Sequence, residues 1–188
     1  MKQHLPDLQS RLTVNKVFVI KVHRIATLSL LLSLSILAVP VHAESPDVSL
    51  ADMDGKQHHL SEYIGKGKWV FFNIWGPRCP PCVEEMPDLQ DFHDAHKDKD
   101  AIVVGMALDY PSFGQADVEE VREFVDDYFI TFPILLGNGR TIESLGGGML
   151  QGTPTTLVYD PSGKLFAQQL GALNRKVLET FMTEQNKK

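Results

Sequence analysis

Both cysteines of this 188-residue chain lie in one stretch, Trp75-Gly76-Pro77-Arg78-Cys79-Pro80-Pro81-Cys82, three positions apart. An apolar run precedes the pair, and a segment with helical spacing and several acidic residues follows it. A strand, then Cys-x-x-Cys, then the start of a helix is the arrangement that thiol–disulfide chemistry requires. A thiolate at a helix N-terminus is stabilised by the unpaired backbone N–H groups and the positive end of the helix dipole.

Two other interpretations of the cysteine pair are weaker. A structural disulfide at this spacing closes a loop of only a few residues, so it would remove little entropy from the unfolded chain. A zinc site needs about four Cys or His ligands, and the sequence has no second Cys-x-x-Cys. His93 and His96 are candidate partners, but their spacing favours the solvated face of a helix.

The N-terminus has the pattern of a secretory signal peptide. Basic residues precede the apolar run 25–39, which breaks at Pro40 and ends in Val41-His42-Ala43. Because a membrane-spanning helix needs about 20 apolar residues, we expect residues 1–43 to be a signal peptide, with an uncleaved anchor as the alternative. Export would place the cysteines in a periplasmic or other extracytoplasmic compartment where disulfides persist.

Residues 44–188 are then long enough for one domain with its own core. Their net charge is −10, which disfavours binding to nucleic acid or to anionic membranes. Hydrophobic patterning predicts an α/β domain in which helices flank a sheet. The expected elements are a hairpin over 48–60 with a turn at 52–55, strands over 69–75, 101–108, 132–136, 155–159 and 164–170, and helices over 80–95, 118–129 and 174–185.

Several polar residues call for a structural interpretation. Asn73 interrupts an otherwise apolar strand, so its buried amide needs a partner, and Cys82, Glu85 or backbone groups are the candidates. His58 and His59 adjoin each other on a strand and point to opposite faces, which is typical of histidines at a surface edge. His93 belongs by its spacing to the solvated face of its helix, as does His96.

The chain from about Pro46 onward resembles the thioredoxin fold, and more narrowly the exported TlpA/ResA/DsbE-like thiol–disulfide reductases. The N-terminal hairpin contributes to the resemblance. The residues that carry it are Phe72-Asn73-Ile74-Trp75, Cys79-Pro80-Pro81-Cys82, Glu85, Pro87 and the downstream Gly152-Thr153-Pro154-Thr155-Thr156. The resemblance implies a central mixed β-sheet flanked by helices, with an N-terminal β-hairpin extension.

The resemblance also implies roles for individual residues. Cys79 would be the exposed attacking thiolate and Cys82 the buried resolving thiol. Thr153 and Pro154 would form a cis-proline loop beside the sulfurs and bind substrate together with Trp75.

The resemblance leaves two further positions to interpret, a difference from ordinary thioredoxins at Asn73 and a departure from the family at Arg78. Ordinary thioredoxins have a buried Asp at the position of Asn73, and because Asn accepts no proton, Glu85 would accept the proton of Cys82. Arg78 stands where the family usually has an aromatic residue, and its charge would lower the pKa of Cys79.

The expected function is reduction of disulfides in exported proteins, with cytochrome c maturation as one setting. Pro80 and Pro81 offer no N–H to a thiolate on Cys79, which favours a reductant, whereas Arg78 argues the other way. The redox-active disulfide Cys79–Cys82 would be the only redox group, without a cofactor or a metal. We expect a monomer that receives electrons from a membrane donor of the DsbD/CcdA type. The alternatives are an exported oxidase or isomerase, a copper-holding thiol chaperone and a peroxidase.

Overall fold

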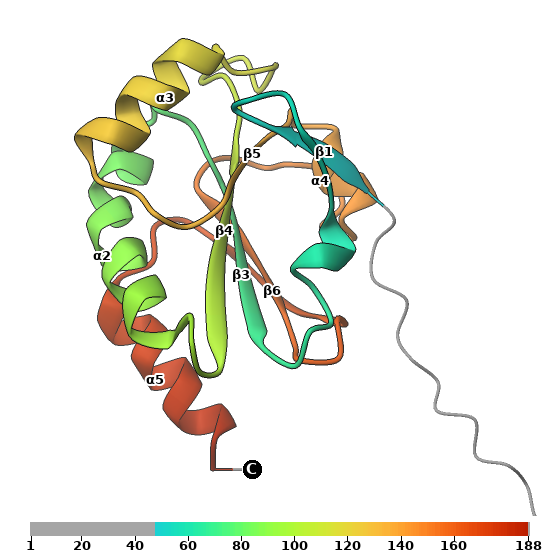
Figure 1. Cartoon of the computed structure of the whole chain (residues 1–188), viewed down its shortest axis with the longest axis vertical. Coiled ribbons are helices and arrows are strands. Elements are labelled where there is room, and N and C mark those ends of the chain that lie inside the picture. The colour runs from blue at the N-terminus through green and yellow to red at the C-terminus, as the bar shows by residue number, and fades with distance from the viewer. Residues whose placement is uncertain (1–47, 188) are drawn as a thin grey trace, which may run out of the picture. The chain divides into compact units, whose positions relative to one another are not determined.

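The computed structural model describes residues 48–187, and its centre is a seven-stranded sheet in the order β2-β1-β5-β4-β3-β6-β7 (Figure 1). Strands β3, β4 and β5 are parallel, and the remaining pairings are antiparallel. The predicted mixed sheet is therefore confirmed, whereas the predicted boundary at residue 43 lies outside the described residues. The strands are β1 (Ser49–Asp52), β2 (Gln57–His59), β3 (Trp69–Trp75), β4 (Ala101–Ala107), β5 (Ile134–Leu136), β6 (Thr155–Tyr159) and β7 (Leu165–Leu170).

Helices cover both faces of the sheet. The helices are η2 (Leu60–Glu62), α2 (Pro80–His96), α3 (Val118–Asp127), α4 (Thr141–Ser144) and α5 (Arg175–Gln185). Buried residues of α2, α3 and α5 belong to one hydrophobic cluster, and those of η2 and α4 belong to the other. Within residues 48–187, no helix combines the length and apolar character needed to cross a membrane.

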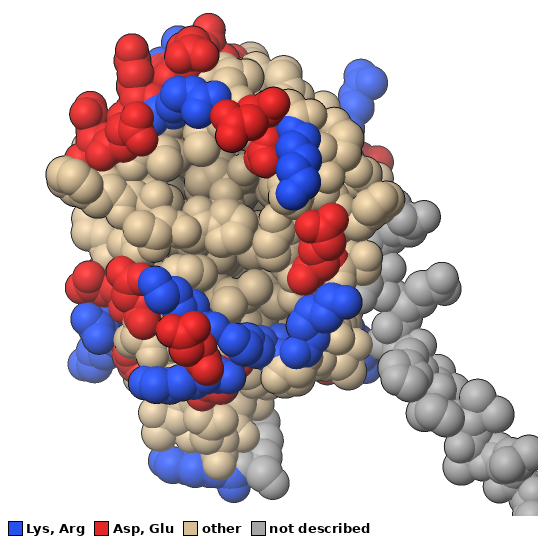
Figure 2. All heavy atoms as spheres, viewed as in Figure 1, with Lys and Arg blue, Asp and Glu red and all other residues tan. Residues whose placement is uncertain are grey.

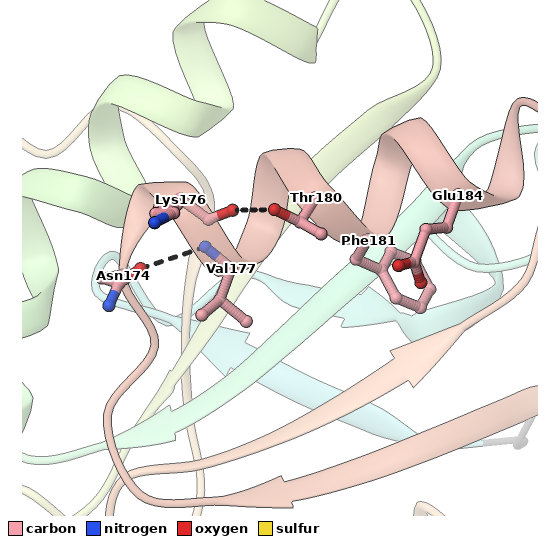
Figure 3. Close-up of a pocket in the computed structure, with 6 residues that line it drawn as sticks. All are labelled: Asn174, Lys176, Val177, Thr180, Phe181 and Glu184. Atoms are coloured by element: carbon pink, nitrogen blue, oxygen red, sulfur yellow. Dashed lines mark hydrogen bonds between the residues drawn. The ribbon is translucent and has the colours of Figure 1, made fainter.

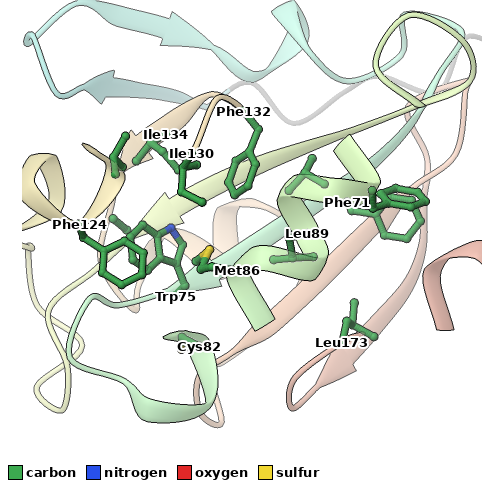
Figure 4. Packing of buried hydrophobic residues seen from close by; sticks show 14 of the residues in the cluster. Phe71, Trp75, Cys82, Met86, Leu89, Phe124, Ile130, Phe132, Ile134 and Leu173 are labelled. Carbon is green, nitrogen blue, oxygen red and sulfur yellow. The ribbon is translucent and has the colours of Figure 1, made fainter. Parts of the chain in front are cut away.

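The central strand β3 is buried on both faces, as its continuous apolar sequence predicts. Phe71 and Trp75 face the cluster beneath α2, which Figure 4 shows together with Cys82. Cys79 belongs to the same cluster. Phe72 and Ile74 face the opposite cluster. Because β3 ends where α2 begins, the cysteine pair lies at the edge of this core.

The predicted N-terminal hairpin is present, and it extends the sheet. The carboxylate of Asp52 accepts hydrogen bonds from the N–H groups of Asp54 and Lys56, at 2.9 and 3.0 Å. Gly55 has a φ of +81°, a conformation that glycine adopts without steric cost. Strand β1 then pairs with β5 as well as β2, so the hairpin is part of the main sheet.

Helix α3 is two residues shorter than predicted. Phe129 has a φ of +53°, which ends the helical conformation, and its side chain is 81% exposed. The extension of the predicted helix to Phe129 was therefore wrong. The apolar side chains of Val121, Phe124 and Val125 in α3 are buried.

The histidines of α2 do not form a solvated face. His93 is 6% exposed, and its Nδ1 accepts a hydrogen bond of 3.1 Å from the N–H of Val103. His96 stacks on Phe92 and lies between the carboxylates of Asp100 and Glu179. Both interactions join α2 to other parts of the fold, which the spacing of residues within one helix does not reveal.

The hairpin histidine His58 is also partly buried, contrary to its interpretation as a surface residue. Its two ring nitrogens lie 2.9 Å from the Asp52 carboxylate and 3.0 Å from the Glu62 carboxylate. The hydrogen bonds to Glu62 and Asp52 raise the pKa of His58 above its usual value. This side chain therefore stabilises the join between the hairpin and η2.

We predict that His93→Leu destabilises the protein by about 1–3 kcal/mol at pH 8, because the buried N–H of Val103 loses its acceptor. Burial lowers the pKa of His93 in the folded protein. The unfolded chain therefore binds a proton that the folded protein does not, and wild-type stability falls as the pH drops below about 6.5. Urea unfolding at pH 8 and pH 5.5 should show a smaller penalty for the variant at the lower pH. An equal penalty at both values would contradict the buried neutral imidazole.

Candidate active site

The cysteine pair is a disulfide at the start of α2. Cys79 is the residue immediately before the helix, and its Cα lies 5.2 Å from that of Cys82. The carbonyl of Cys79 accepts 3.0 Å hydrogen bonds from the N–H groups of Cys82 and Val83. Pro80 and Pro81 occupy the first two helical positions and have no N–H to donate. A thiolate on Cys79 would therefore meet few backbone donors from its own helix.

Both cysteines are fully buried, with 0% of each residue exposed. The prediction that Cys79 is exposed was therefore wrong for this disulfide state. Thr153 lies directly beside the sulfur, since its hydroxyl donates a 3.4 Å hydrogen bond to the Sγ of Cys79. In the disulfide state, Cys79 is therefore covered by neighbouring groups, and Thr153 is one of them.

The peptide bond between Thr153 and Pro154 is cis, as the resemblance implies. The bond directly precedes β6, which pairs with β3, and the hydroxyl of Thr153 brings this loop to the disulfide. The loop therefore lies where the predicted substrate-binding segment should be. Contact of Thr153 and Pro154 with a substrate stays a prediction.

Trp75 is not at the surface. Its side chain is fully buried, and its ring centroid lies 4.8 Å from that of Phe124 on α3. Gly105 provides the space on the neighbouring strand, because a Cβ there would lie 3.0 Å from the indole nitrogen of Trp75. The predicted contact of Trp75 with substrate does not fit this burial, and the structure favours a packing role.

Glu85 is a buried carboxylic acid, 2% exposed, on the inward face of α2. One carboxylate oxygen accepts a 2.8 Å hydrogen bond from the Nδ2 of Asn73, and the other accepts a 2.7 Å bond from the N–H of Leu173. Burial raises the pKa of Glu85 to about 7, and the two hydrogen bonds oppose that rise. The carboxyl group can therefore gain or lose a proton near neutral pH.

The neighbours of Glu85 come from three other parts of the chain. Asn73 is on β3, and its Nδ2 also donates a 3.1 Å hydrogen bond to Thr156 on β6. Leu173 lies just before α5, 88 positions after Glu85. Of the candidate partners that the sequence offered for Asn73, the structure shows Glu85. Sequence reasoning missed Leu173, because its contribution is a backbone N–H, which any residue except proline would supply.

Cys82 and Glu85 lie three positions apart on the same face of α2, and both are buried. Side chains at this spacing are neighbours on the helix surface. A carboxyl group with a pKa near neutrality, beside a buried thiol, is suited to accept the proton of that thiol. The role of Glu85 in the reaction stays a prediction.

Arg78 is bound to carboxylates rather than left facing the disulfide. Its guanidinium pairs with Asp109 and lies 3.3 Å from the carboxylate of Glu120 on α3. Hydrogen bonds from Ser112 and Arg78 lower the pKa of Asp109. Acidic side chains also gather over α3 (Figure 2). The positive charge of Arg78 is thus largely compensated, so its expected effect on the pKa of Cys79 is weakened.

A surface pocket of about 510 Å³ lies along α5 (Figure 3). Within it, the side-chain oxygen of Asn174 accepts a hydrogen bond from the N–H of Val177, and the Thr180 hydroxyl donates to the carbonyl of Lys176. These polar groups are therefore engaged within the helix. The pocket includes none of the predicted site residues.

The site combines a buried disulfide at a helix start, a cis-proline loop and a buried acid on the active-site helix, all packed against a mixed sheet. This combination defines a thioredoxin-fold thiol–disulfide site. Residues 41–168 match the model of the AhpC/TSA family. The thiol-disulfide oxidoreductase ResA of Bacillus thuringiensis (strain Al Hakam) is 31% identical over 140 residues, which cover 74% of this chain and 75% of the relative. The chain therefore belongs to the AhpC/TSA family and, within it, to the TlpA/ResA-like thiol–disulfide oxidoreductases.

Solved structures support the same assignment. A DsbF homologue from Corynebacterium diphtheriae is 28% identical, with a TM-score of 0.64, over 78% of this chain and 88% of that one. A secreted thiol-disulfide isomerase from Corynebacterium glutamicum is also 28% identical, with a TM-score of 0.62, over 73% of this chain and 81% of that one. The thioredoxin fold is thus shared with solved structures of this class.

We predict that Thr153→Val raises the pKa of reduced Cys79 by about one to two, because a hydrogen bond to a charged group is worth about 1.5–3 kcal/mol. The pH dependence of the alkylation rate of Cys79 measures this pKa. Thr155→Val is the matched control, since the hydroxyl of Thr155 donates to the carbonyl of Gly152 instead. An unchanged pKa in Thr153→Val would show that the hydroxyl does not stabilise the thiolate.

Proposed function

We propose that this protein is an exported disulfide reductase that acts on protein substrates. The observation that carries the proposal is the start of α2, where Pro80 and Pro81 follow Cys79 and provide no N–H donors. A thiolate that receives few hydrogen bonds is less stable relative to the disulfide, and a dithiol of this kind gives up its electrons readily. The Thr153 hydroxyl supplies one donor to the sulfur, fewer than a helix start without prolines would offer.

The reaction proceeds by two exchanges. The thiolate of Cys79 attacks one sulfur of the substrate disulfide, which forms a mixed disulfide and releases the other substrate sulfur as a thiolate that takes up a proton. Cys82 then loses its proton to Glu85 and attacks the Sγ of Cys79. The second substrate sulfur leaves as a thiolate, and Cys79 and Cys82 are joined again. The substrate gains two electrons from the protein dithiol. Its two sulfurs take up two protons: one from solvent, which received the proton of Cys79 when the thiolate formed, and the one that Glu85 accepted from Cys82.

A dithiol on a membrane donor of the DsbD/CcdA type would return the protein to its reduced form by the reverse exchange. The substrates would be exported proteins with disulfides, and apocytochrome c during its maturation is one such class. The redox-active disulfide would be the only redox group. We propose a monomer, and the net negative charge of residues 44–188 supports the proposal that it does not bind nucleic acid.

A second candidate function is an exported oxidase or isomerase. The hydrogen bond from Thr153 to the Sγ of Cys79 favours it, because a donor that stabilises the thiolate makes the reduced form more stable. The relative from Corynebacterium glutamicum described as an isomerase supports this alternative as well. The direction of electron flow decides between the two functions.

We predict export with removal of residues 1–43, on the basis of the apolar run 25–39 and the Val41-His42-Ala43 exit. The secreted relative from Corynebacterium glutamicum supports export. Mass spectrometry of the protein isolated from its native host should find Glu44 at the N-terminus. An intact N-terminus in the membrane fraction would show that the segment is an anchor.

Trapping of the reaction intermediate tests the function. We predict that Cys82→Ser accumulates mixed disulfides between Cys79 and exported proteins, because the resolving thiol is missing. Cys79→Ser should trap none. The wild-type protein, reduced beforehand, should reduce the trapped proteins when they are offered in oxidised form. If it instead only oxidises their reduced forms, the protein is an oxidase.

The role of Glu85 is tested by the pH dependence of resolution. We predict that the wild-type rate at which Cys82 resolves the mixed disulfide rises through about pH 7, where Glu85 becomes a carboxylate. Glu85→Gln should lose this rise and be slower at pH 8 by roughly 10²–10⁴-fold, the usual contribution of a general base. Alkylation of Cys79 should change little.

Glu84→Gln is the matched control, because Glu84 is an exposed acid on the same turn of α2. Its resolution rate should follow the wild type. If Glu85→Gln resolves the mixed disulfide as fast as the wild type from about pH 6 to pH 9, Glu85 serves packing alone.

A further inference from the structure

The amide of Asn73 has an unused hydrogen-bond acceptor in the interior of the protein. Its Nδ2 donates to Glu85 and Thr156, at 2.8 and 3.1 Å. Its Oδ1 has no partner among the described residues, and Asn73 is 0% exposed. A buried acceptor without a donor is unfavourable and uncommon in proteins, so this atom requires an explanation.

The packing of β3 against α2 places Asn73 and Cys82 in the same interface. The ring of Phe71 on β3 lies 5.1 Å from that of Phe92 near the end of α2. Two residues further along β3, Asn73 contacts Glu85. The helix therefore runs antiparallel to the strand, and Cys82 lies one turn beyond Glu85, in the direction in which β3 continues. Asn73 and Cys82 thus belong to the same interface.

Reduction of the disulfide turns Cys82 into a hydrogen-bond donor, which is what the unpaired Oδ1 of Asn73 lacks. In the disulfide, the Sγ of Cys82 carries no hydrogen and cannot donate. When a partner dithiol reduces the disulfide, two electrons and two protons are added, and Cys82 becomes a thiol with an S–H donor. The interface between β3 and α2 then gains one donor, and it already holds an acceptor that has none.

We propose that Asn73 is a positioning residue of the redox cycle: its Oδ1 accepts the S–H of Cys82 in the reduced protein, while its Nδ2 holds Glu85. The proposal rests on the cycle described under Proposed function, but not on its direction. One amide then holds both the thiol that must lose a proton and the carboxylate that receives it. The bond exists only in the reduced state, so Asn73 stabilises that state relative to the disulfide.

Infrared spectroscopy of the reduced thiol tests the hydrogen bond directly. Cys79→Ala leaves Cys82 as the single thiol of the chain, so one S–H stretching band is observed. In this background the band should lie at the lower frequency of a hydrogen-bonded thiol. Asn73→Leu should move it to the frequency of a free thiol, and Asn73→Asp, which keeps an acceptor oxygen, should restore it. Thr156→Val is the matched control and should leave it in place, because Thr156 contacts only the Nδ2.

The equilibrium between the two redox states provides a second readout. Loss of one buried hydrogen bond from the reduced form in Asn73→Leu should lower the equilibrium constant for reduction by a dithiol about fivefold, or roughly 20 mV for this two-electron couple. Thr156→Val should change this equilibrium constant less. A band at the free-thiol frequency with Asn73 present would overturn the proposal. That result would leave the reductase function untouched, since trapping and electron flow are measured separately.

Discussion

The carboxyl group of Glu85 is the buried charge around which the site is arranged. An ionised carboxylate in a protein interior is costly unless hydrogen bonds compensate for its lost hydration. Here Asn73 on β3 and the N–H of Leu173 before α5 supply those bonds, and Asn73 also binds Thr156 on β6. One acid therefore connects the central strand, the active-site helix, the strand after the cis-proline loop and the segment that leads into the last helix.

The same group makes the fold and the chemistry depend on each other. The pKa of Glu85 is raised to about 7, so between about pH 4.5 and pH 7 the folded protein binds a proton that the unfolded chain releases. Its contribution to stability is lost as the pH rises towards and through 7. A more hydrophilic environment around Glu85 would remove this loss of stability at higher pH. It would also leave Glu85 with the ordinary pKa of a carboxyl group, so that Glu85 would bind a proton only in acid.

Sequence patterns predicted the elements of the fold well, because those elements follow from local spacing. The run 69–75 is apolar on both faces and is the central strand, and Asp52 to Gly55 form the hairpin turn. Patterns failed where a distant part of the chain decides the environment. His93 has the spacing of a solvated residue but binds a backbone N–H of β4, and Cys79 is covered in the disulfide state beside Thr153.

In the active site, too, the sequence indicated some features, whereas others depend on distant parts of the chain. The cysteine pair, Glu85 and the cis Thr153–Pro154 bond lie together as the resemblance implies. The compensation of Arg78 by Asp109 and Glu120 involves three segments whose proximity is set by the packing of α3 over the end of the sheet. No spacing in the sequence indicates it, and it removes the main argument for an oxidising dithiol that the sequence offered.

The reduction potential of the Cys79–Cys82 pair tests the central claim most directly. Equilibration with glutathione buffers of known ratio, followed by alkylation and mass spectrometry, measures it. Two prolines without N–H donors and a compensated Arg78 predict a value near that of thioredoxin, about −270 mV. A value near that of the strong oxidant DsbA, about −120 mV, would contradict the reductase and favour the oxidase.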